Sequence, residues 1–181
     1  MPFTFLDTPI KDLIVIEPKV FRDGRGFFLE AYKKPEFASH GIDVDFLQDN
    51  HSYSQYGVLR GLHFQVPPYA QGKLVSCVQG SVWDVAVDLR EYSPTFTRWY
   101  GLELSSDNHK MMYIPPGFAH GFLVLSKNAQ FQYKCTEIYN KDAERGILWN
   151  DPVLEIAWPI GCSDLNISDK DLELPAFKEL F

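Results

Sequence analysis

The stretch Ser81-Val-Trp-Asp-Val-Ala-Val-Asp-Leu89 decides the fold class, because its residues alternate with the two-residue period of a β-strand. One face of the expected strand is apolar and consists of Trp83, Val85, Val87 and Leu89. The other face carries two acids and consists of Val82, Asp84, Ala86 and Asp88. The alternation predicts a strand over Val82–Leu89 in a protein built mainly from β-structure.

Short apolar or alternating runs recur on both sides of this stretch, bounded by Gly, Pro, Asn, Asp and Ser. The other predicted strands are Leu13–Ile16, Gly26–Tyr32, Val58–Phe64, Lys73–Val78, Trp99–Leu104, Met111–Ile114, Phe122–Leu125 and Ala129–Tyr139. Helical signals are confined to a short turn over Pro35–His40, ended by Gly41, and to about the last dozen residues. Many short strands at turn-marked intervals predict an all-β fold, a β-sandwich or jelly-roll barrel with a few short peripheral helices.

The size and charge of the chain limit its partners. A chain of 181 residues, 45% of them hydrophobic, can bury one sizeable core, so we expect a single domain over residues 1–181. The formal net charge of -7 disfavours nucleic-acid and membrane-surface binding, because the overall field does not attract a polyanion. An anionic ligand must therefore be held by a local cluster of cations.

The first residues and the cysteines indicate the cytoplasm. The chain starts without a basic segment before an apolar run, and none of its apolar stretches is long enough to span a bilayer. Cys77, Cys135 and Cys162 are odd in number, widely spaced and free of CxxC pairing. We expect a cytoplasmic protein whose thiols are reduced and behave as small buried hydrophobes.

Two segments resemble the paired motifs of the cupin superfamily, whose fold is a small jelly-roll barrel, or double-stranded β-helix. Gly57 and His63 match the opening of the first motif, G-x5-H-x-H. Gln65 stands at the second His of that motif, and Lys73 stands at the Glu that follows it. The second motif, P-x-G-x-x-H, is matched by residues 115–120. The resemblance implies a cupin-type barrel.

The substitution of Lys73 for the cupin Glu changes the expected chemistry. A divalent ion needs neutral imidazole, carboxylate or thiolate donors, whereas an ammonium offers only protons and a positive charge. We therefore expect no metal and no other cofactor. On the cupin pattern alone, His63 and His120 remain open to being ordinary core histidines.

Several further stretches are similar to the dTDP-4-dehydrorhamnose 3,5-epimerase family. They are Gly24–Glu30, Gln48–Ser52, Val58–Gln65, Gln71–Val75, Asp84–Arg90, Ile114–Phe122, Tyr133, Tyr139, Gly146–Asp151 and Ser168–Asp171. The resemblance covers about residues 10 to 175 and implies a homodimeric enzyme of bacterial dTDP-L-rhamnose synthesis. Ser76, the Glu144–Gly146 stretch and the Val66–Gln71 loop depart from the family pattern.

The resemblance assigns the catalytic residues. Epimerisation beside a ketone needs a base, an opposing acid and a cation near the oxygen. His63 is the expected base, because an imidazole accepts a proton near neutral pH, and Asp171 is its expected partner. Tyr133 is the expected proton donor, and Lys73 is expected to offset the charge of the enolate.

The resemblance also assigns the substrate-binding residues. Arg25 and Arg60 are expected to hold the nucleotide diphosphate, because guanidinium groups grip phosphate oxygens bidentately. His120 is expected to line the barrel and to hydrogen-bond the sugar. Tyr139 is expected to stack on thymine. The other expected substrate contacts are Glu30, Gln48, Asn50, Glu144 and Lys170. On an alternating strand Gln48 and Asn50 share a face that Asp49 does not. Asp84 is a weaker candidate, which as an inward acid could tune Lys73 or His63 or merely hold structure.

Four alternatives stay open on the sequence. A sister enzyme that inverts only C3 or only C5 would use the same acid and base. A 3,4-ketoisomerase of the same fold is disfavoured by the set of His63, Lys73 and Tyr133. A non-catalytic cupin-like nucleotide-sugar binding module would not need that set, and a metal-dependent cupin dioxygenase or isomerase would carry a stoichiometric metal.

Overall fold

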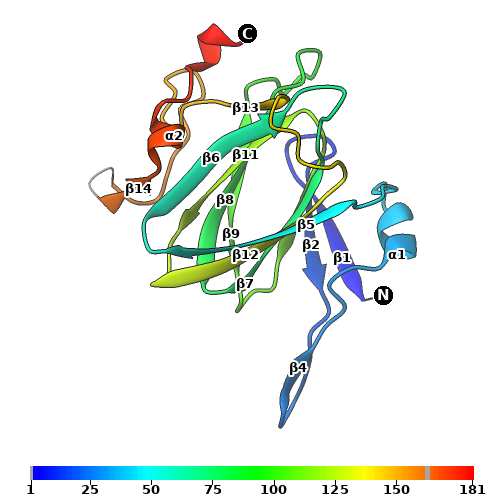
Figure 1. Cartoon of the computed structure of the whole chain (residues 1–181). Helices are drawn as coiled ribbons and strands as arrows, with labels where there is room; N and C mark the ends of the chain where they lie inside the picture. Colours follow the sequence, from blue (N-terminus) through cyan, green and yellow to red (C-terminus); the bar gives the residue numbers. More distant parts are fainter. Residues whose placement is uncertain (1, 162–163) are drawn as a thin grey trace.

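Two antiparallel sheets face each other in the computed structural model, which describes residues 2–161 and 164–181 (Figure 1). Sheet I has the strand order β1 (Phe3–Asp7), β2 (Ile14–Pro18), β10 (Met111–Ile114), β7 (Lys73–Gln79), β12 (Asn128–Cys135) and β5 (Gln48–Gln55). Sheet II has the order β13 (Glu144–Gly146), β6 (Val58–Gln65), β11 (Phe118–Val124), β8 (Ser81–Asp88) and β9 (Trp99–Ser105), and β14 (Asn166–Ile167) pairs in parallel with β6. The predicted all-β, cupin-type jelly-roll fold is confirmed.

The main core fills the space between the two sheets. Sheet I contributes inward side chains such as Val75, Met112 and Phe131, and sheet II contributes Ala86 and Phe122 among others. These side chains are at most 4% exposed. Burial of such apolar area stabilises the fold by roughly 25 cal/mol per Å², so the two sheets are held face to face.

The strand β8 is buried on both of its faces. Its predicted apolar face lies on the outside of sheet II, where the C-terminal segment covers it with Ile147, Leu154 and Phe177. Its acid-bearing face points into the barrel, and Asp84 and Asp88 are both 0% exposed. Buried carboxylates require hydrogen-bonded partners, and both residues have them.

Short peripheral elements complete the fold. The helix α1 (Lys34–Ala38) overlaps the helical turn predicted over Pro35–His40. The helix α2 (Asp169–Leu172) and a 3-10 helix (Phe177–Glu179) lie in the C-terminal segment. None of the described helices is long and apolar enough to cross a bilayer.

Two strand predictions were too long. The predicted Gly26–Tyr32 strand is only β4 (Gly26–Phe28), which pairs with β3 (Phe21–Asp23) in a hairpin that projects from the barrel (Figure 1). Beyond it the chain turns toward α1, where Tyr32 packs on Phe37. The predicted Ala129–Tyr139 strand ends at Cys135, and residues 136–143 form a loop. The hairpin carries Arg25, and the loop carries Tyr139.

Candidate active site

A cavity of about 260 Å³ opens between the two sheets and holds most of the predicted site residues. Its lining residues come from β5, β7 and β12 of sheet I, from β6 and β13 of sheet II, and from two loops. They are Gln48, Asn50, His63, Phe64, Gln65, Gln71, Lys73, Tyr133, Tyr139 and Glu144.

His63 and Asp171 form a hydrogen-bonded pair at this cavity. His63 Nε2 lies 2.7 Å from Asp171 Oδ1, and the backbone N–H of Gly61 donates to Asp171 Oδ2 at 3.3 Å. Burial acts to raise the pKa of Asp171, but the bond and charge of His63 and the Gly61 N–H outweigh it, so the pKa is lowered. Asp171 is therefore a carboxylate that fixes the imidazole, and His63 Nδ1 makes no hydrogen bond with any described residue. That nitrogen is free to act as a base.

Ser168 places Asp171 at the dyad. Its side chain caps the start of α2 by accepting the N–H of Asp171 at 3.2 Å, and this fixes the first turn of the helix. The parallel pairing of β14 with β6 brings the whole C-terminal segment beside the strand that carries His63. Residues 108 positions apart in the chain thus become hydrogen-bonded partners.

Tyr133 and Lys73 face His63 from the opposite sheet. Both belong to sheet I, and the Nζ atom of Lys73 lies 6.0 Å from the centroid of the Tyr133 ring. Burial raises the pKa of Tyr133, with a further rise from Cys135, while the charge of Arg60 acts to lower it. Tyr133 is thus held as a protonated phenol, which is able to donate a proton and lies across the cavity from His63.

Lys73 places its amino group inside the barrel. Burial lowers its pKa, and the nearby Cys135, Asp84 and Glu144 act in the opposite direction. No described residue hydrogen-bonds its ammonium group. A partly desolvated ammonium with free donors is suited to meet a negative charge that develops on a ligand oxygen.

His120 lies beside the dyad, on β11 opposite His63 of β6. Its Nε2 is 2.8 Å from Asp84 Oδ1, and its ring stacks on Phe131 at 6.0 Å. Burial lowers the pKa of His120 more strongly than Asp84 raises it, so the imidazole is neutral. Among the described residues, the second carboxylate oxygen of Asp84 has no hydrogen-bond partner. The structure places Asp84 inside the barrel, near Lys73, as its inward position predicts.

Glu144 organises the rim of the cavity. Its Oε2 accepts from Lys170 at 2.7 Å and from the phenol of Tyr139 at 3.0 Å. Burial acts to raise the pKa of Glu144, but these two bonds and the charge of Lys170 lower it. Glu144, Lys170 and Tyr139 are therefore brought together as a polar cluster, with the Tyr139 ring half exposed.

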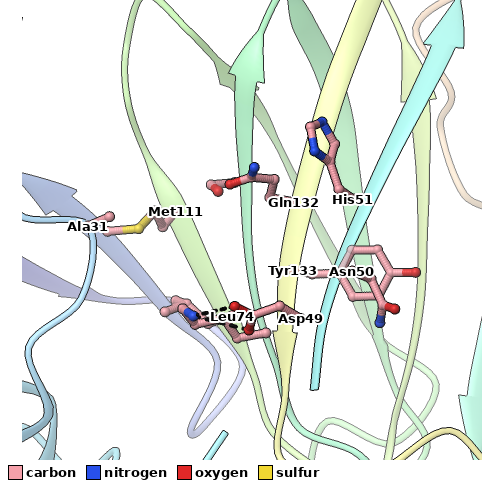
Figure 2. Close-up of a pocket in the computed structure, with 10 residues that line it drawn as sticks. Ala31, Asp49, Asn50, His51, Leu74, Met111, Gln132 and Tyr133 are labelled. Atoms are coloured by element: carbon pink, nitrogen blue, oxygen red, sulfur yellow. Dashed lines mark hydrogen bonds and ion pairs between the residues drawn. The ribbon is translucent and has the colours of Figure 1, made fainter. Parts of the chain in front are cut away.

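Gln48 and Asn50 line the cavity while Asp49 lies outside it, as alternation predicts. Gln48 Nε2 donates to Asn50 Oδ1 at 3.0 Å. Asp49 pairs with Lys134 at 2.9 Å beside a second cavity, of about 190 Å³, on the outer side of sheet I. Figure 2 shows Asp49 and Asn50 pointing to opposite sides of the sheet.

Five predicted binding residues do not line the cavity: His120 and Lys170, described above, and Arg60, Arg25 and Glu30. Arg60 is near it, because its charge influences Tyr133, and its Nε donates to Ser54 at 3.1 Å. Arg25 is in the projecting hairpin, with its side chain 91% exposed and paired with Asp23 at 2.5 Å. Glu30 follows the hairpin and pairs with Lys33 at 4.0 Å. Within one chain, Arg25 and Glu30 are not brought to the cavity.

Sequence reasoning did not assign a site role to Gln65 or Gln71, although both line the cavity. Gln65 could have been noticed because it occupies a cupin ligand position. Cys77 and Cys135 are buried free thiols, as predicted, while Cys162 lies outside the described residues. Among residues 2–161 and 164–181, no group of three or more His, Cys, Asp or Glu side chains is placed to hold a metal ion.

An imidazole with a free nitrogen, an opposed phenol and a buried lysine around one cavity of a jelly-roll barrel are the groups that an isomerase of the cupin fold needs to move protons at carbon. Comparison with known proteins narrows this class. The family model described as dTDP-4-dehydrorhamnose 3,5-epimerase matches residues 7–179. The chain belongs to the dTDP-4-dehydrorhamnose 3,5-epimerase family.

Individual relatives agree over nearly the whole chain. The dTDP-4-dehydrorhamnose 3,5-epimerase of Shigella flexneri is 54% identical over 168 residues, which cover 92% of each chain. The crystal structure of the enzyme of that name from Elizabethkingia anophelis NUHP1 is 52% identical, with a TM-score of 0.95 and coverage of 99% and 98%. A dTDP-6-deoxy-D-glucose-3,5-epimerase from Legionella pneumophila Philadelphia 1, in complex with dTDP-4-keto-L-rhamnose, is 46% identical, with a TM-score of 0.95 and coverage of 99% and 95%.

Proposed function

We propose that the protein converts dTDP-4-dehydro-6-deoxy-D-glucose to dTDP-4-dehydro-L-rhamnose by inverting C3 and C5, in dTDP-L-rhamnose synthesis. The observation that carries the proposal is His63 of sheet II, hydrogen-bonded to Asp171 of α2, which faces Tyr133 and Lys73 of sheet I across one cavity. The family and the ligand of the Legionella relative support the choice of substrate.

The first step is removal of a proton beside the C4 ketone. His63 Nδ1 takes the proton from C3 or C5, and the electron pair of that C–H bond moves to give an enolate with its charge on the C4 oxygen. The carboxylate of Asp171 stabilises the imidazolium that forms, because it is 2.7 Å from the other ring nitrogen. The ammonium of Lys73 meets the charge on the oxygen.

The second step returns a proton to the opposite face of the same carbon. Tyr133 supplies it, because β12 places the phenol across the cavity from β6 and its raised pKa keeps it protonated. The tyrosinate is then reprotonated from solvent, and His63 gives up its proton, so the enzyme is reset without a cofactor. The same base and acid serve both carbons, one after the other.

We propose that the chain acts as a cytoplasmic homodimer in which the hairpin completes the partner's site. The hairpin exposes Phe21, Phe27 and Phe28 by 49%, 55% and 64%. Exposed aromatic side chains grouped on a projecting element are typical of a surface that another chain covers. Such an arrangement would let Arg25 reach the nucleotide diphosphate, next to Arg60 of the other protomer.

Mixed dimers test the hairpin proposal. Arg25→Ala and His63→Ala chains are each expected to be poorly active alone. If Arg25 acts in the partner's site, their mixture regains activity, because one site per mixed dimer then has both wild-type residues. If Arg25 acts in its own chain, the mixture stays inactive and the proposal fails.

A coupled assay tests the activity itself. The chelator-treated protein is mixed with dTDP-4-dehydro-6-deoxy-D-glucose, NADPH and the next reductase, and the reduced sugar is identified by NMR. The expected product is dTDP-L-rhamnose. A sugar inverted at one carbon would identify a monofunctional epimerase, and no inverted product with retained nucleotide binding would favour a binding module.

A further inference from the structure

Three glutamine side chains hold four consecutive backbone positions of the loop that carries Tyr139. Gln71 Nε2 donates to the carbonyl of Glu137 at 2.6 Å. Gln65 Nε2 donates to the carbonyl of Ile138 at 3.3 Å. The remaining two bonds run the other way, from the N–H of Tyr139 to Gln48 Oε1 at 2.9 Å and from the N–H of Asn140 to Gln65 Oε1 at 2.7 Å.

These bonds pair the backbone N–H and C=O groups of the loop, as a neighbouring strand would pair those of a strand. Residues 136–143 lie outside helices and strands, so their polar backbone groups need partners from elsewhere. Glutamine suits this task, because its amide both donates and accepts. Gln65 uses both functions, is 6% exposed and also donates to the carbonyl of Tyr69 at 2.6 Å, which ties a second loop to the first.

Gln65 occupies the position at which metal-binding cupins have their second histidine. In this chain its side chain is directed to three backbone groups, not to a central ion. The residue therefore belongs to the architecture of the loop beside the cavity.

We propose that Gln65 and Gln71, with Gln48, are positioning residues for nucleotide binding: they fix the 137–140 segment so that the Tyr139 ring is ready to stack on the base. The inference rests on the proposed function and on the role that the family resemblance gives Tyr139, stacking on the base of a dTDP-sugar. We call these three glutamines and their four bonds to the 137–140 segment the glutamine clamp. Because the sugar chemistry depends on other residues, His63, Tyr133 and Lys73, the clamp acts on the affinity for the nucleotide and leaves the proton-transfer steps unchanged.

The test measures dTDP binding by calorimetry and epimerase kinetics for Gln65→Met and Gln71→Met. Loss of the clamp is expected to raise the Kd for dTDP and the KM about tenfold, with kcat changed by less than about twofold. The matched control is Gln130→Met, because Gln130 lies on the outer face of its strand, where its Nε2 donates to Gln79 at 2.6 Å. This substitution should leave the Kd, the KM and kcat unchanged. A merely structural role would not separate KM from kcat.

A double-mutant cycle with Tyr139→Ala separates failure of this inference from failure of the proposed function. If the clamp acts through Tyr139, Gln65→Met adds little to the loss of dTDP affinity that Tyr139→Ala causes. Normal affinity in Gln65→Met and Gln71→Met, with weak binding in Tyr139→Ala, would overturn the clamp alone. Normal affinity in all three would overturn the clamp and the assignment of Tyr139 as well.

Amide hydrogen exchange keeps the test decisive if Gln65→Met folds poorly. Gln71 is only partly buried, so Gln71→Met should fold, and its loop amides at Tyr139 and Asn140 should exchange faster than in the wild type. Unchanged exchange together with unchanged Kd in that variant would refute the inference.

Discussion

Replacing Asp171 with Asn removes the negative charge behind the base while keeping the shape of the side chain. Asp171 is 4% exposed, and its Oδ1 lies 2.7 Å from His63 Nε2. When His63 takes a proton from the sugar, both partners of this hydrogen bond are charged, and hydrogen bonds to charged groups contribute about 1.5–3 kcal/mol. If that stabilisation is lost only in the transition state, kcat falls by about 10- to 150-fold.

The assay for Asp171→Asn follows hydrogen exchange at C3 and C5 of the substrate under saturating conditions. Asp49→Asn is the matched control, because Asp49 pairs with Lys134 on the outer side of sheet I and should leave kcat unchanged. Urea unfolding of both variants verifies that they are folded. A kcat for Asp171→Asn within about twofold of the wild type would refute the role of the carboxylate.

Three further substitutions test the rest of the site and the fold. Tyr133→Phe should slow inversion by about 100-fold or more while exchange continues in part, since deprotonation does not need the phenol; full inversion by NMR would indicate another acid. Lys73→Met should lower kcat by about 100- to 1,000-fold, and steady-state kinetics with normal turnover would remove Lys73 from enolate stabilisation. Burial acts to raise the pKa of Asp88, but the hydrogen bonds from Arg90, Ser93 and Thr95 lower it. The ionised Asp88 therefore stabilises the fold above the ordinary carboxyl pKa, and this stabilisation is lost as the pH falls through the lower pKa of the folded state. In urea unfolding, Asp88→Asn should therefore be less stable than the wild type at pH 6, with a smaller gap at pH 3; an equal gap would contradict this.

Most strands with aliphatic side chains were predictable from the sequence, including β6, β7 and β12, which line the cavity, whereas β5 was not. The predicted Met111–Ile114 strand matches β10 residue for residue. The strand β5 (Gln48–Gln55) has no aliphatic residue, because its inward side chains face the polar cavity instead of the core. Hydrophobic periodicity gives no signal for such a strand.

The site was predictable where a motif or resemblance marks a residue, and not where its role depends on the fold. The cupin motifs mark His63, Lys73 and His120, and the structure places all three inside the barrel. The pairing of Asp171 with His63 joins distant parts of the chain and came only from the family resemblance. The glutamine clamp was not predictable from residue spacing, because Gln65 and Gln71 bind backbone groups that any residue type carries.

The central claim is that one base, His63, removes the protons from both C3 and C5. The most direct measurement is NMR of the chelator-treated protein with dTDP-4-dehydro-6-deoxy-D-glucose in deuterated water, for the wild type and for His63→Ala. We predict that deuterium enters both positions with the wild type and neither position with His63→Ala. Continued exchange at either carbon in the variant would contradict the account, because a second base would then be required.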